Sequence, residues 1–488
     1  MAEPAPSLHR TMPAADVPQW HSETDVAVIG FGAAGACAAI EAANAGARVM
    51  LFERNSGSGG ASGLSGGEIY IGGGGGSDAQ RAAGFEDKTE DFERYLKMAG
   101  GPCANDAKCE AYATSALDHY AWLKAQGVPY RGNYLPGKLI EPADDSTLIW
   151  SGSEAAAPFC EKAKPAPRGH VIQHMGWGGG RPLLDVLEAK ARELGTEVIV
   201  DARILGLIED SGRIVGAAIK LDGKVQYIRA LKGVVLATGG FVMNEEMRRK
   251  YCPDSFRIND PIGDKDDGSG IQLGVSAGGE AVHMDQFFTT CPWTMPEPQA
   301  SGVFVNVQGK RFINEDCYHG RVSRCAVDQP GGKVYLLLDS AHFSEPAEFA
   351  RTPIAATGDT WEEVEAELEM PAGSLAHTMT LYNNHAHEGR DPLFDKRAPI
   401  LTPLDQGPFV ALELNFETSY FSFFTLGGLN TSAHGEVLQA DGTPVAGLFA
   451  AGRCTHGLPA WGHGYSSGMS LADCTFFGRR AGVAAANG

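Results

Sequence analysis

The clearest hydrophobic pattern in the chain is a short apolar run that ends in glycine and is followed by an alanine-rich stretch. Residues 25–30 (DVAVIG) are rich in β-branched side chains, which is typical of a buried parallel strand. The alanine-rich stretch continues to Asn44 and predicts a helix that Gly46 ends. Residues 48–53 (RVMLFE) predict a second strand that closes with Glu53. The pattern therefore predicts a complete βαβ unit.

Comparable strand-and-glycine patterns return much later in the chain. Residues 232–240 (KGVVLATGG) predict a strand that ends in a glycine turn, and residues 447–452 (GLFAAG) predict another. A last helix is expected from Gly468 to Ala485. The chain thus returns to the same kind of strand near its end.

The first unit carries the residues that bind a dinucleotide. Gly30 suits a tight turn, Gly32 lets a pyrophosphate approach the backbone, and Gly35 lets the helix pack on the strand. The helix N-terminus favours negative charge, and Glu53 can accept a hydrogen bond from a ribose hydroxyl. Because strand, helix and acid are all present, we predict dinucleotide binding here.

FAD and NAD share this fingerprint, so other features must separate them. The turn at residues 232–240 lacks the third glycine, which leaves a single unit of this kind. Between residues 57 and 76 the chain is rich in glycine around a short apolar run at 68–71 (EIYI). This segment reads either as a flexible linker or as backbone held close to a flat ligand. We favour the second interpretation.

Charge and composition exclude several classes of protein. Of 488 residues, 40 are Lys or Arg and 60 are Asp or Glu, so the net charge is 40 − 60 = −20 and nucleic acid is an unfavourable partner. No run of about 18 apolar residues predicts a membrane-spanning helix. The first 22 residues lack the basic start and apolar run of a secretory signal, so we expect a cytoplasmic protein. Ten cysteines without a Cys-x-x-Cys pair predict reduced thiols and no metal site.

The motifs together resemble the fumarate reductase/succinate dehydrogenase flavoprotein superfamily. They are, in order along the chain, residues 30–53, 237–241 (ATGGF), 305–315 (VNVQGKRFINE), 425–428 (TLGG) and 447–452. This resemblance implies an α/β fold: a Rossmann-like, doubly wound FAD-binding domain with an inserted α+β catalytic domain that caps the flavin. It predicts an N-terminal extension at 1–22, FAD-binding parts at 23–269 and 406–488, and the cap at 270–405.

The resemblance also implies how FAD is held. Members with covalently attached flavin use a histidine in the glycine-rich segment after the acid, and residues 55–60 (NSGSGG) contain none, so we expect non-covalent FAD. The residues expected to bind it are Gly30, Gly32, Ala33, Ala34, Gly35, Glu53, Arg54, Gly60, Ala61, Ser62, Ser65, Gly66, Gly67, Ala237, Thr238, Gly239, Gly452, Gly468, Ser470 and Leu471.

Two positions depart from the fumarate-reducing members of this superfamily. Those members share an arginine four residues beyond the glutamate of the Arg-Phe-x-Asn-Glu motif. They also share a histidine just before the Thr-x-Gly-Gly turn. Here the two positions are His319 and Phe424. A dicarboxylate would lose two of its cations, although Arg311, Arg321 and Arg324 keep that alternative open.

The residues around these positions are similar to those of the 3-ketosteroid dehydrogenases. Tyr318 lies beside the vacated arginine position, and residues 462–468 (GHGYSSG) supply Tyr465 and Ser467. The compact length and the Tyr-Ser-Ser-Gly loop are most similar to the Δ4-(5α) type, which desaturates C4–C5. The alternatives are the Δ1 type, a fumarate- or enoate-reductase-type flavoenzyme, and an electron-transferring flavoprotein subunit of a larger complex.

The chemistry explains why phenols are wanted at this site. Desaturating a ketone removes a proton from the α carbon and a hydride from the β carbon, with flavin N5 as the hydride acceptor. We assign Tyr318 as the base, Tyr465 as hydrogen-bond donor to the carbonyl oxygen and Ser467 as a relay or orienting hydroxyl, and the two tyrosine roles can be exchanged. His319 and His463 are supporting candidates.

The expected substrate is an apolar ketone of the steroid class. Aromatic side chains gather in segments expected to line the domain interface, where they would either hold a rigid apolar ligand or form core. They are Phe287, Phe288, Trp293, Phe416, Tyr420, Phe421, Phe423 and Phe424. The sequence does not identify the electron acceptor.

Overall fold

The computed structural model describes residues 9–138, 145–174, 178–290 and 297–488. Within these residues the largest sheet has nine strands, in the order β1-β9-β10-β22-β11-β2-β3-β8, with β21 pairing to β22. The strands are β1 (Arg10–Pro13), β2 (Ser22–Ile29), β3 (Val49–Phe52), β8 (Glu197–Ile199), β9 (Arg203–Asp210), β10 (Arg213–Leu221), β11 (Lys224–Leu236), β21 (Glu436–Leu438) and β22 (Pro444–Ala450).

The centre of this sheet is parallel, as the apolar runs predict. β2 pairs in parallel with both β3 and β11, and β11 pairs in parallel with β22. Along β2, Val26 and Val28 join one hydrophobic cluster while Ala27 and Ile29 join another, so both faces of the sheet are covered. The predicted βαβ unit is confirmed, and its strand ends open toward the same edge.

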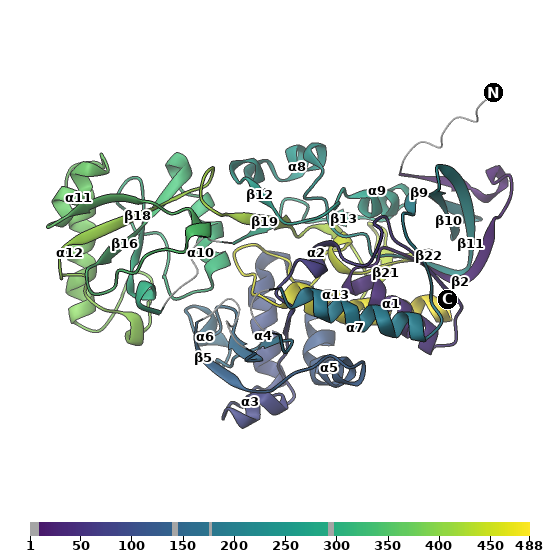
Figure 1. Ribbon diagram of the computed structural model, residues 1–488, viewed down its shortest axis with the longest axis horizontal. Coiled ribbons are helices and arrows are strands. Elements are labelled where there is room, and N and C mark those ends of the chain that lie inside the picture. Colours follow the sequence, from purple (N-terminus) through teal and green to yellow (C-terminus); the bar gives the residue numbers. More distant parts are fainter. Residues whose placement is uncertain (1–8, 139–144, 175–177, 291–296) are drawn as a thin grey trace.

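Helices α1 (Ala33–Asn44), α7 (Gly180–Glu193) and α13 (Met469–Asn487) lie together on one side of the sheet (Figure 1). The predicted first and last helices are both present, and they cross at small residues. A Cβ added to Gly482 would lie 2.2 Å from the carbonyl oxygen of Ala38, and one added to Gly478 would lie 2.5 Å from that of Ala34. Glycine therefore allows the last helix to pack closely on the nucleotide-binding helix.

A separate layer carries the motif at residues 305–315 and lies at the far left of Figure 1. Its sheet has the order β15-β16-β18-β17, formed by β15 (Val303–Asn306), β16 (Lys333–Asp339), β18 (Phe409–Asn415) and β17 (Ile354–Gly358). The helices are α10 (His319–Val327), α11 (Trp361–Glu367) and α12 (Ser374–His387). We call this layer the cap. The predicted boundaries at 270 and 405 stay predictions, and β18 adds a strand from beyond residue 405.

The remaining elements form two further parts of the molecule. A four-stranded sheet has the order β4 (Glu68–Tyr70), β7 (Gly169–Val171), β6 (Leu148–Trp150) and β5 (Tyr134–Lys138). The helices of this part of the chain are α2 (Gly60–Gly63), α3 (Asp78–Ala82), α4 (Thr89–Gly100), α5 (Asp106–Ala125) and α6 (Phe159–Lys162). Between the main sheet and the cap lie α8 (Glu245–Tyr251), α9 (Ser269–Ser276), β12 (Asp260–Pro261), β13 (Ala281–Val282) and β19 (Ser422–Thr425) (Figure 1). β14 (Phe287–Thr289) pairs with β19, and β20 (Gly428–Leu429) pairs with β13. Short 3₁₀ helices occur at Ala14–Asp16, Gly101–Cys103, Pro253–Arg257, Glu297–Ser301, Pro330–Gly332, Glu348–Ala350, Ala398–Ile400 and Gly452–Cys454.

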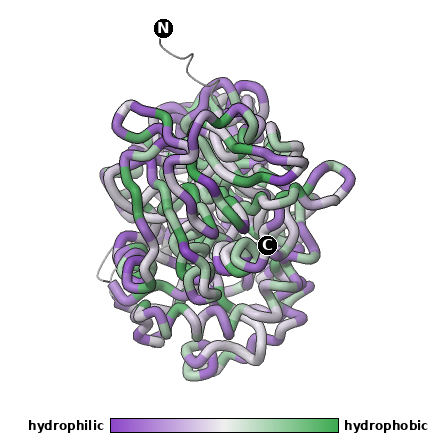
Figure 2. The backbone as a smooth tube through the Cα atoms, turned by 90° about the vertical axis from the view of Figure 1, so that its right-hand side faces the viewer, coloured by the Kyte–Doolittle hydropathy of each residue, from purple (hydrophilic) through white to green (hydrophobic). Residues whose placement is uncertain are grey.

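Hydrophobic segments run through the interior of the molecule, while hydrophilic ones are common in its outer loops (Figure 2). Among the described residues, no helix combines the length and the apolar character needed to cross a bilayer. Residues 10–13, which fall within the predicted N-terminal extension, pair with β9 at the edge of the main sheet.

Candidate active site

A cavity of about 380 Å³ lies at the carboxyl ends of the central parallel strands and reaches to the cap. Its wall includes the turn after β2, the end of β3, the turn after β11 and the segment after β22. In open α/β sheets, ligands bind at this edge. The wall continues through Tyr318 and His319 at the start of α10 and through the loop that precedes α13.

The nucleotide-binding turn fits a pyrophosphate. Gly30 has φ +106°, and a Cβ there would lie 2.3 Å from the carbonyl oxygen of Ala237, so the ends of β2 and β11 approach as only glycine permits. Gly32 presents bare backbone to the cavity, at the N-terminus of α1. The amide of Ala33 donates to Ser62 Oγ at 3.2 Å. A helix N-terminus beside uncovered backbone is a favourable place for an anion.

Glu53 closes β3 and faces the same cavity. Its two carboxylate oxygens accept from the amides of Phe31 at 2.6 Å and Asn55 at 2.8 Å. Burial raises the pKa of Glu53, while these backbone donors act in the opposite direction. A carboxylate has about four acceptor positions, so Glu53 retains capacity for a further donor such as a ribose hydroxyl.

An acidic loop that sequence reasoning missed lines the cavity near Glu53. Asp264, Lys265, Asp266 and Asp267 precede α9 and lie on the wall. Arg54 donates to Asp267 at 2.6 Å, and Arg453 donates to Asp266 at 2.9 Å. Each pair joins residues about two hundred positions apart, which is why no local pattern identified them. The acidic loop thus neutralises two arginines on the wall.

The two expected catalytic tyrosines meet over an aromatic surface. Tyr318 precedes α10 and Tyr465 lies in the loop before α13, yet their ring centroids are 6.2 Å apart. The ring of Phe288 lies 4.2 Å from that of Tyr465 and 6.3 Å from that of Tyr318. Phe424 lies 4.8 Å from Phe288. All four rings are buried and line the cavity.

The hydroxyl of Tyr465 is held by a serine other than the expected one. Tyr465 Oη donates to Ser470 Oγ at 3.1 Å, and Ser470 is expected from sequence only as a flavin-binding residue. Ser467 also lines the cavity, and its amide donates to the carbonyl oxygen of Ser151 at 2.9 Å. Burial raises the pKa of Tyr465 to about 12. Its phenol therefore keeps its proton at neutral pH.

The two histidine candidates have different surroundings. His319 is buried, lines the cavity and has its ring 4.1 Å from that of Tyr318. His463 lies within 2.9 Å of the carboxylate of Asp328 in the segment after α10. His319 therefore stays a candidate for supporting Tyr318, whereas His463 links the C-terminal loop to the cap.

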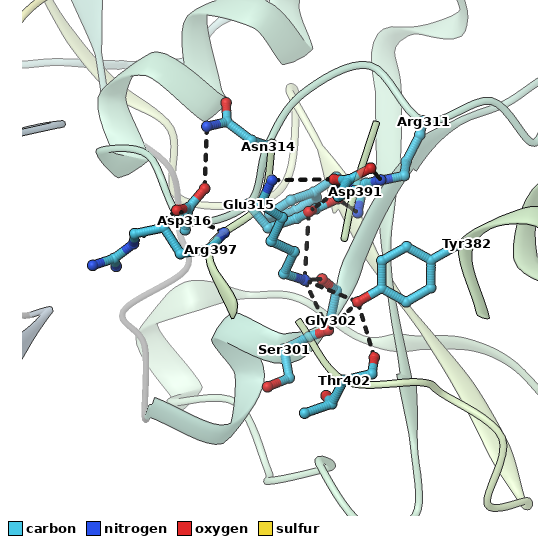
Figure 3. A network of polar contacts seen from close by, with 12 residues as sticks. Ser301, Gly302, Arg311, Asn314, Glu315, Asp316, Tyr382, Asp391, Arg397 and Thr402 are labelled. Carbon is cyan, nitrogen blue, oxygen red and sulfur yellow. Dashed lines mark hydrogen bonds and ion pairs between the residues drawn. The ribbon is translucent and has the colours of Figure 1, made fainter. Parts of the chain in front are cut away.

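The cap arginines that kept a dicarboxylate substrate open bind protein groups. Figure 3 shows Arg311 between two acids: it donates to Glu315 at 2.7 Å and to Asp391 at 2.8 Å. Arg321 donates to the carbonyl oxygen of His463 at 2.9 Å, and Arg324 pairs with Asp328 at 2.6 Å. Among the described residues, the arginines on the cavity wall are Arg54, Arg203 and Arg453.

Most residues expected to bind FAD do lie around one cavity. All of those named above line it except Gly35 and Gly67. A Cβ on Gly35 would lie 1.9 Å from the carbonyl oxygen of Gly30, so this glycine serves helix packing, as the fingerprint predicts. A Cβ on Gly67 would lie 2.3 Å from the backbone of Gly179. Contact with FAD stays a prediction for every residue of this set.

The aromatic residues divide between the cavity and the core. Phe288, Tyr420 and Phe424 line the cavity. The core contains Phe287, Phe416, Phe421 and Phe423. Trp293 lies outside the described residues. Phe349, which the sequence analysis does not single out, joins Tyr420 at the cavity, with ring centroids 5.9 Å apart.

Comparisons with known proteins agree with this geometry. The model of the FAD binding domain family matches residues 25–469. The crystal structure of 3-ketosteroid-Δ4-(5α)-dehydrogenase from Rhodococcus jostii in complex with 4-androstene-3,17-dione is 40% identical, with a TM-score of 0.92, and the match covers 98% of this chain and 99% of that one.

Two curated relatives extend the comparison. The 3-oxo-5-alpha-steroid 4-dehydrogenase of Comamonas testosteroni is 28% identical over 90% of this chain and 94% of its own. The fumarate reductase (cytochrome) of Shewanella frigidimarina is also 28% identical, over 96% of this chain and 77% of its own. The family match spans both the nucleotide-binding turn and the C-terminal loop, and the chain therefore belongs to the FAD binding domain family of flavoproteins.

Proposed function

We propose that this protein desaturates a 3-ketosteroid with FAD as oxidant and that it introduces the C4–C5 double bond of 5α-3-ketosteroids. The observation that carries the proposal is the pair of buried phenols, 6.2 Å apart, at one end of a cavity that begins at a dinucleotide-binding turn. The 40% identity to a dehydrogenase crystallised with 4-androstene-3,17-dione supports the same substrate class.

The cavity fits non-covalent FAD, which when bound supplies a hydride acceptor. Gly32 and the N-terminus of α1 would receive the pyrophosphate, and Glu53 a ribose hydroxyl. No histidine occurs in residues 55–60, where covalent members carry their flavin linkage. Tyr465 and Ser470, which share a hydrogen bond, mark the reactive end.

Tyr465 is proposed as the donor to the steroid carbonyl oxygen. Because burial raises its pKa to about 12, the phenol stays protonated and can donate as negative charge develops on that oxygen. Stabilising the enolate acidifies the α carbon, which makes proton removal feasible for a modest base. The Tyr465 hydroxyl donates to Ser470 Oγ, so donation to the steroid requires the phenol proton to turn to the carbonyl oxygen, with the Ser470 hydroxyl then able to donate to the phenol oxygen. Ser467 remains a candidate relay on the same wall.

Tyr318 is proposed as the base. Its phenolate would accept the proton from the α carbon while the hydride leaves the β carbon toward FAD, so one C–H electron pair forms the new double bond and the other reduces the cofactor. Phe288 and Phe424 would hold the rigid apolar ring system by area rather than by polar contacts. The arginines of the cap bind acids or carbonyl oxygens, which disfavours a dicarboxylate substrate.

Anaerobic mixing tests the proposal. Purified protein loaded with FAD should lose its flavin absorbance on addition of 5α-androstane-3,17-dione and release 4-androstene-3,17-dione. A 1-ene product would assign the Δ1 reaction instead. Bleaching by succinate alone would support a fumarate-reductase-type enzyme, and bleaching by neither compound would reject the proposal.

A further inference from the structure

We propose that Ser153 is a positioning residue that sets the separation of Tyr318 and Tyr465, an inference that rests on the proposed function. Ser153 belongs to a loop of four buried residues, Ser151, Gly152, Ser153 and Glu154, which follows β6 and which we call the strap. The strap hydrogen-bonds to both segments that carry the phenols.

On the cap side, the strap holds the backbone of Tyr318. The amide of Tyr318 donates to Ser153 Oγ at 3.0 Å. Tyr318 is the residue that precedes the first turn of α10, with extended backbone (φ −58°, ψ 137°). This amide makes no hydrogen bond within the helix, because Tyr318 precedes the first turn of α10. The Ser153 hydroxyl therefore fixes the backbone of Tyr318 at the point where the chain enters the helix.

On the other side, the strap holds the loop that carries Tyr465. The amide of Ser467 donates to the carbonyl oxygen of Ser151 at 2.9 Å, and Ser151 Oγ donates to the carbonyl oxygen of Ser467 at 3.2 Å. The amide of Ser153 donates to Tyr95 Oη at 2.9 Å, and that hydroxyl lies 2.7 Å from Ser466 Oγ. Ser153 thus contacts Tyr318 directly and the residue beside Tyr465 through one phenol.

The strap has little room to move. A Cβ on Gly152 would lie 2.4 Å from both Ser466 Oγ and Tyr95 Oη. The carboxylate of Glu154 accepts from the amide of Gly152 at 2.8 Å and from Tyr70 Oη at 2.9 Å. A tightly packed loop bonded to both segments holds the two phenols at a fixed separation, which is what a reaction with two simultaneous C–H cleavages requires.

Ser153→Ala tests the inference in the FAD-loaded protein. We expect kcat for the 5α-3-ketosteroid to fall about tenfold while KM stays within about twofold, because the apolar wall is intact and the phenol geometry is not. The matched control is Ser255→Ala, which also removes a buried hydroxyl that accepts from a neighbour, Arg248 Nε at 3.1 Å, and Ser255 lies outside the cavity wall. It should leave kcat unchanged.

A second readout needs no substrate. With 3-fluorotyrosine at position 318, the ¹⁹F resonance should shift or broaden in Ser153→Ala and stay unchanged in Ser255→Ala. If the alanine variant does not take up FAD, Ser153→Cys, with a weaker acceptor in nearly the same volume, should give the same changes at smaller size. An unchanged resonance would overturn the positioning role even if the wild type oxidises no steroid. A shifted resonance with equal losses of kcat in both alanine variants would reduce Ser153 to a structural residue.

Discussion

The inner cap and the phenol end of the cavity are both buried, yet they use polar groups in opposite ways. In the cap, Arg311 pairs with both Glu315 and Asp391 (Figure 3). Lys396 Nζ lies 3.4 Å from the Glu315 carboxylate. At the phenol end, Tyr318 and Tyr465 share their surroundings with aromatic rings. In the cap the buried charges neutralise one another, whereas the phenol end combines hydroxyls and aromatic rings with Arg453, which lies 4.5 Å from the ring of Phe424 and pairs with Asp266.

The difference explains how one fold can serve different substrates. Burial opposes ionisation of Glu315, but its pKa is lowered because Arg311 and Lys396 favour the carboxylate. Such a closed set of charges has none to offer a substrate. A cavity residue such as His319 or Phe424 can therefore be replaced without breaking the cap network, because Arg311 does not line the cavity.

Breaking the cap network should have the largest effect. Arg311→Met leaves two buried acids without their main partner, and removal of one member of a buried pair costs about 3–5 kcal/mol. We expect the urea midpoint of the FAD-loaded protein to fall accordingly. Turnover per folded molecule should change little, because Arg311 does not line the cavity. Lost turnover at unchanged stability would place this arginine in the reaction and contradict the comparison.

Removing the Tyr465 hydroxyl, the proposed donor, should lower turnover at the phenol end of the cavity and leave the stability of the cap unchanged. Tyr465→Phe takes away one hydroxyl from the cavity, and loss of a preorganised donor lowers kcat by about 10²–10³-fold. FAD content and the unfolding midpoint should stay near wild type, since Phe keeps the contacts with Phe288 and Phe424. Stopped-flow reduction of the flavin measures the rate. A variant that retains wild-type kcat would remove Tyr465 from the mechanism.

The pH profile separates the two phenols. The pKa of Tyr465 is raised from 10 to about 12, so its proton is present across the neutral range and is lost only as pH rises through that value. Donation by Tyr465 should therefore cause no fall in kcat/KM up to about pH 10. A base at Tyr318 gives activity that rises as pH increases. Tyr465→Phe should keep this rising limb, and its disappearance there would exchange the two roles.

The sequence predicts the nucleotide-binding unit well, because the residues that determine its strands and helix lie within one short segment. The strand from Asp25, the helix to Asn44 and the acid at Glu53 follow from apolar runs and glycines within one segment. Tyr318 and Tyr465 were singled out through a family resemblance, because no periodicity relates residues so far apart. The hydroxyl that reaches Tyr465 depends on the turn at Gly468, whose φ of +88° directs the chain into α13.

Contacts between residues far apart in the chain could not be predicted from the sequence. Arg311, which follows β15, meets Asp391, which follows α12, and Ser153 in the strap after β6 meets Tyr318 before α10. A serine in a Ser-Gly-Ser segment looks like an ordinary loop residue. What distinguishes it is burial and a partner from another layer, and both are properties of the folded chain.

The smallest expected effect comes from a partly exposed ion pair of the same cap. Lys333 Nζ lies 2.7 Å from Glu413 on neighbouring strands β16 and β18, but the lysine side chain is 33% exposed, so water and salt screen the pair. Lys333→Gln should cost about 0–1 kcal/mol and leave turnover unchanged. Urea unfolding at low and high salt measures this cost, which should shrink as salt is added. If Lys333→Gln lowered the free energy of unfolding as much as Arg311→Met, the location of a charge in the cap, and not its burial, would decide its contribution to stability.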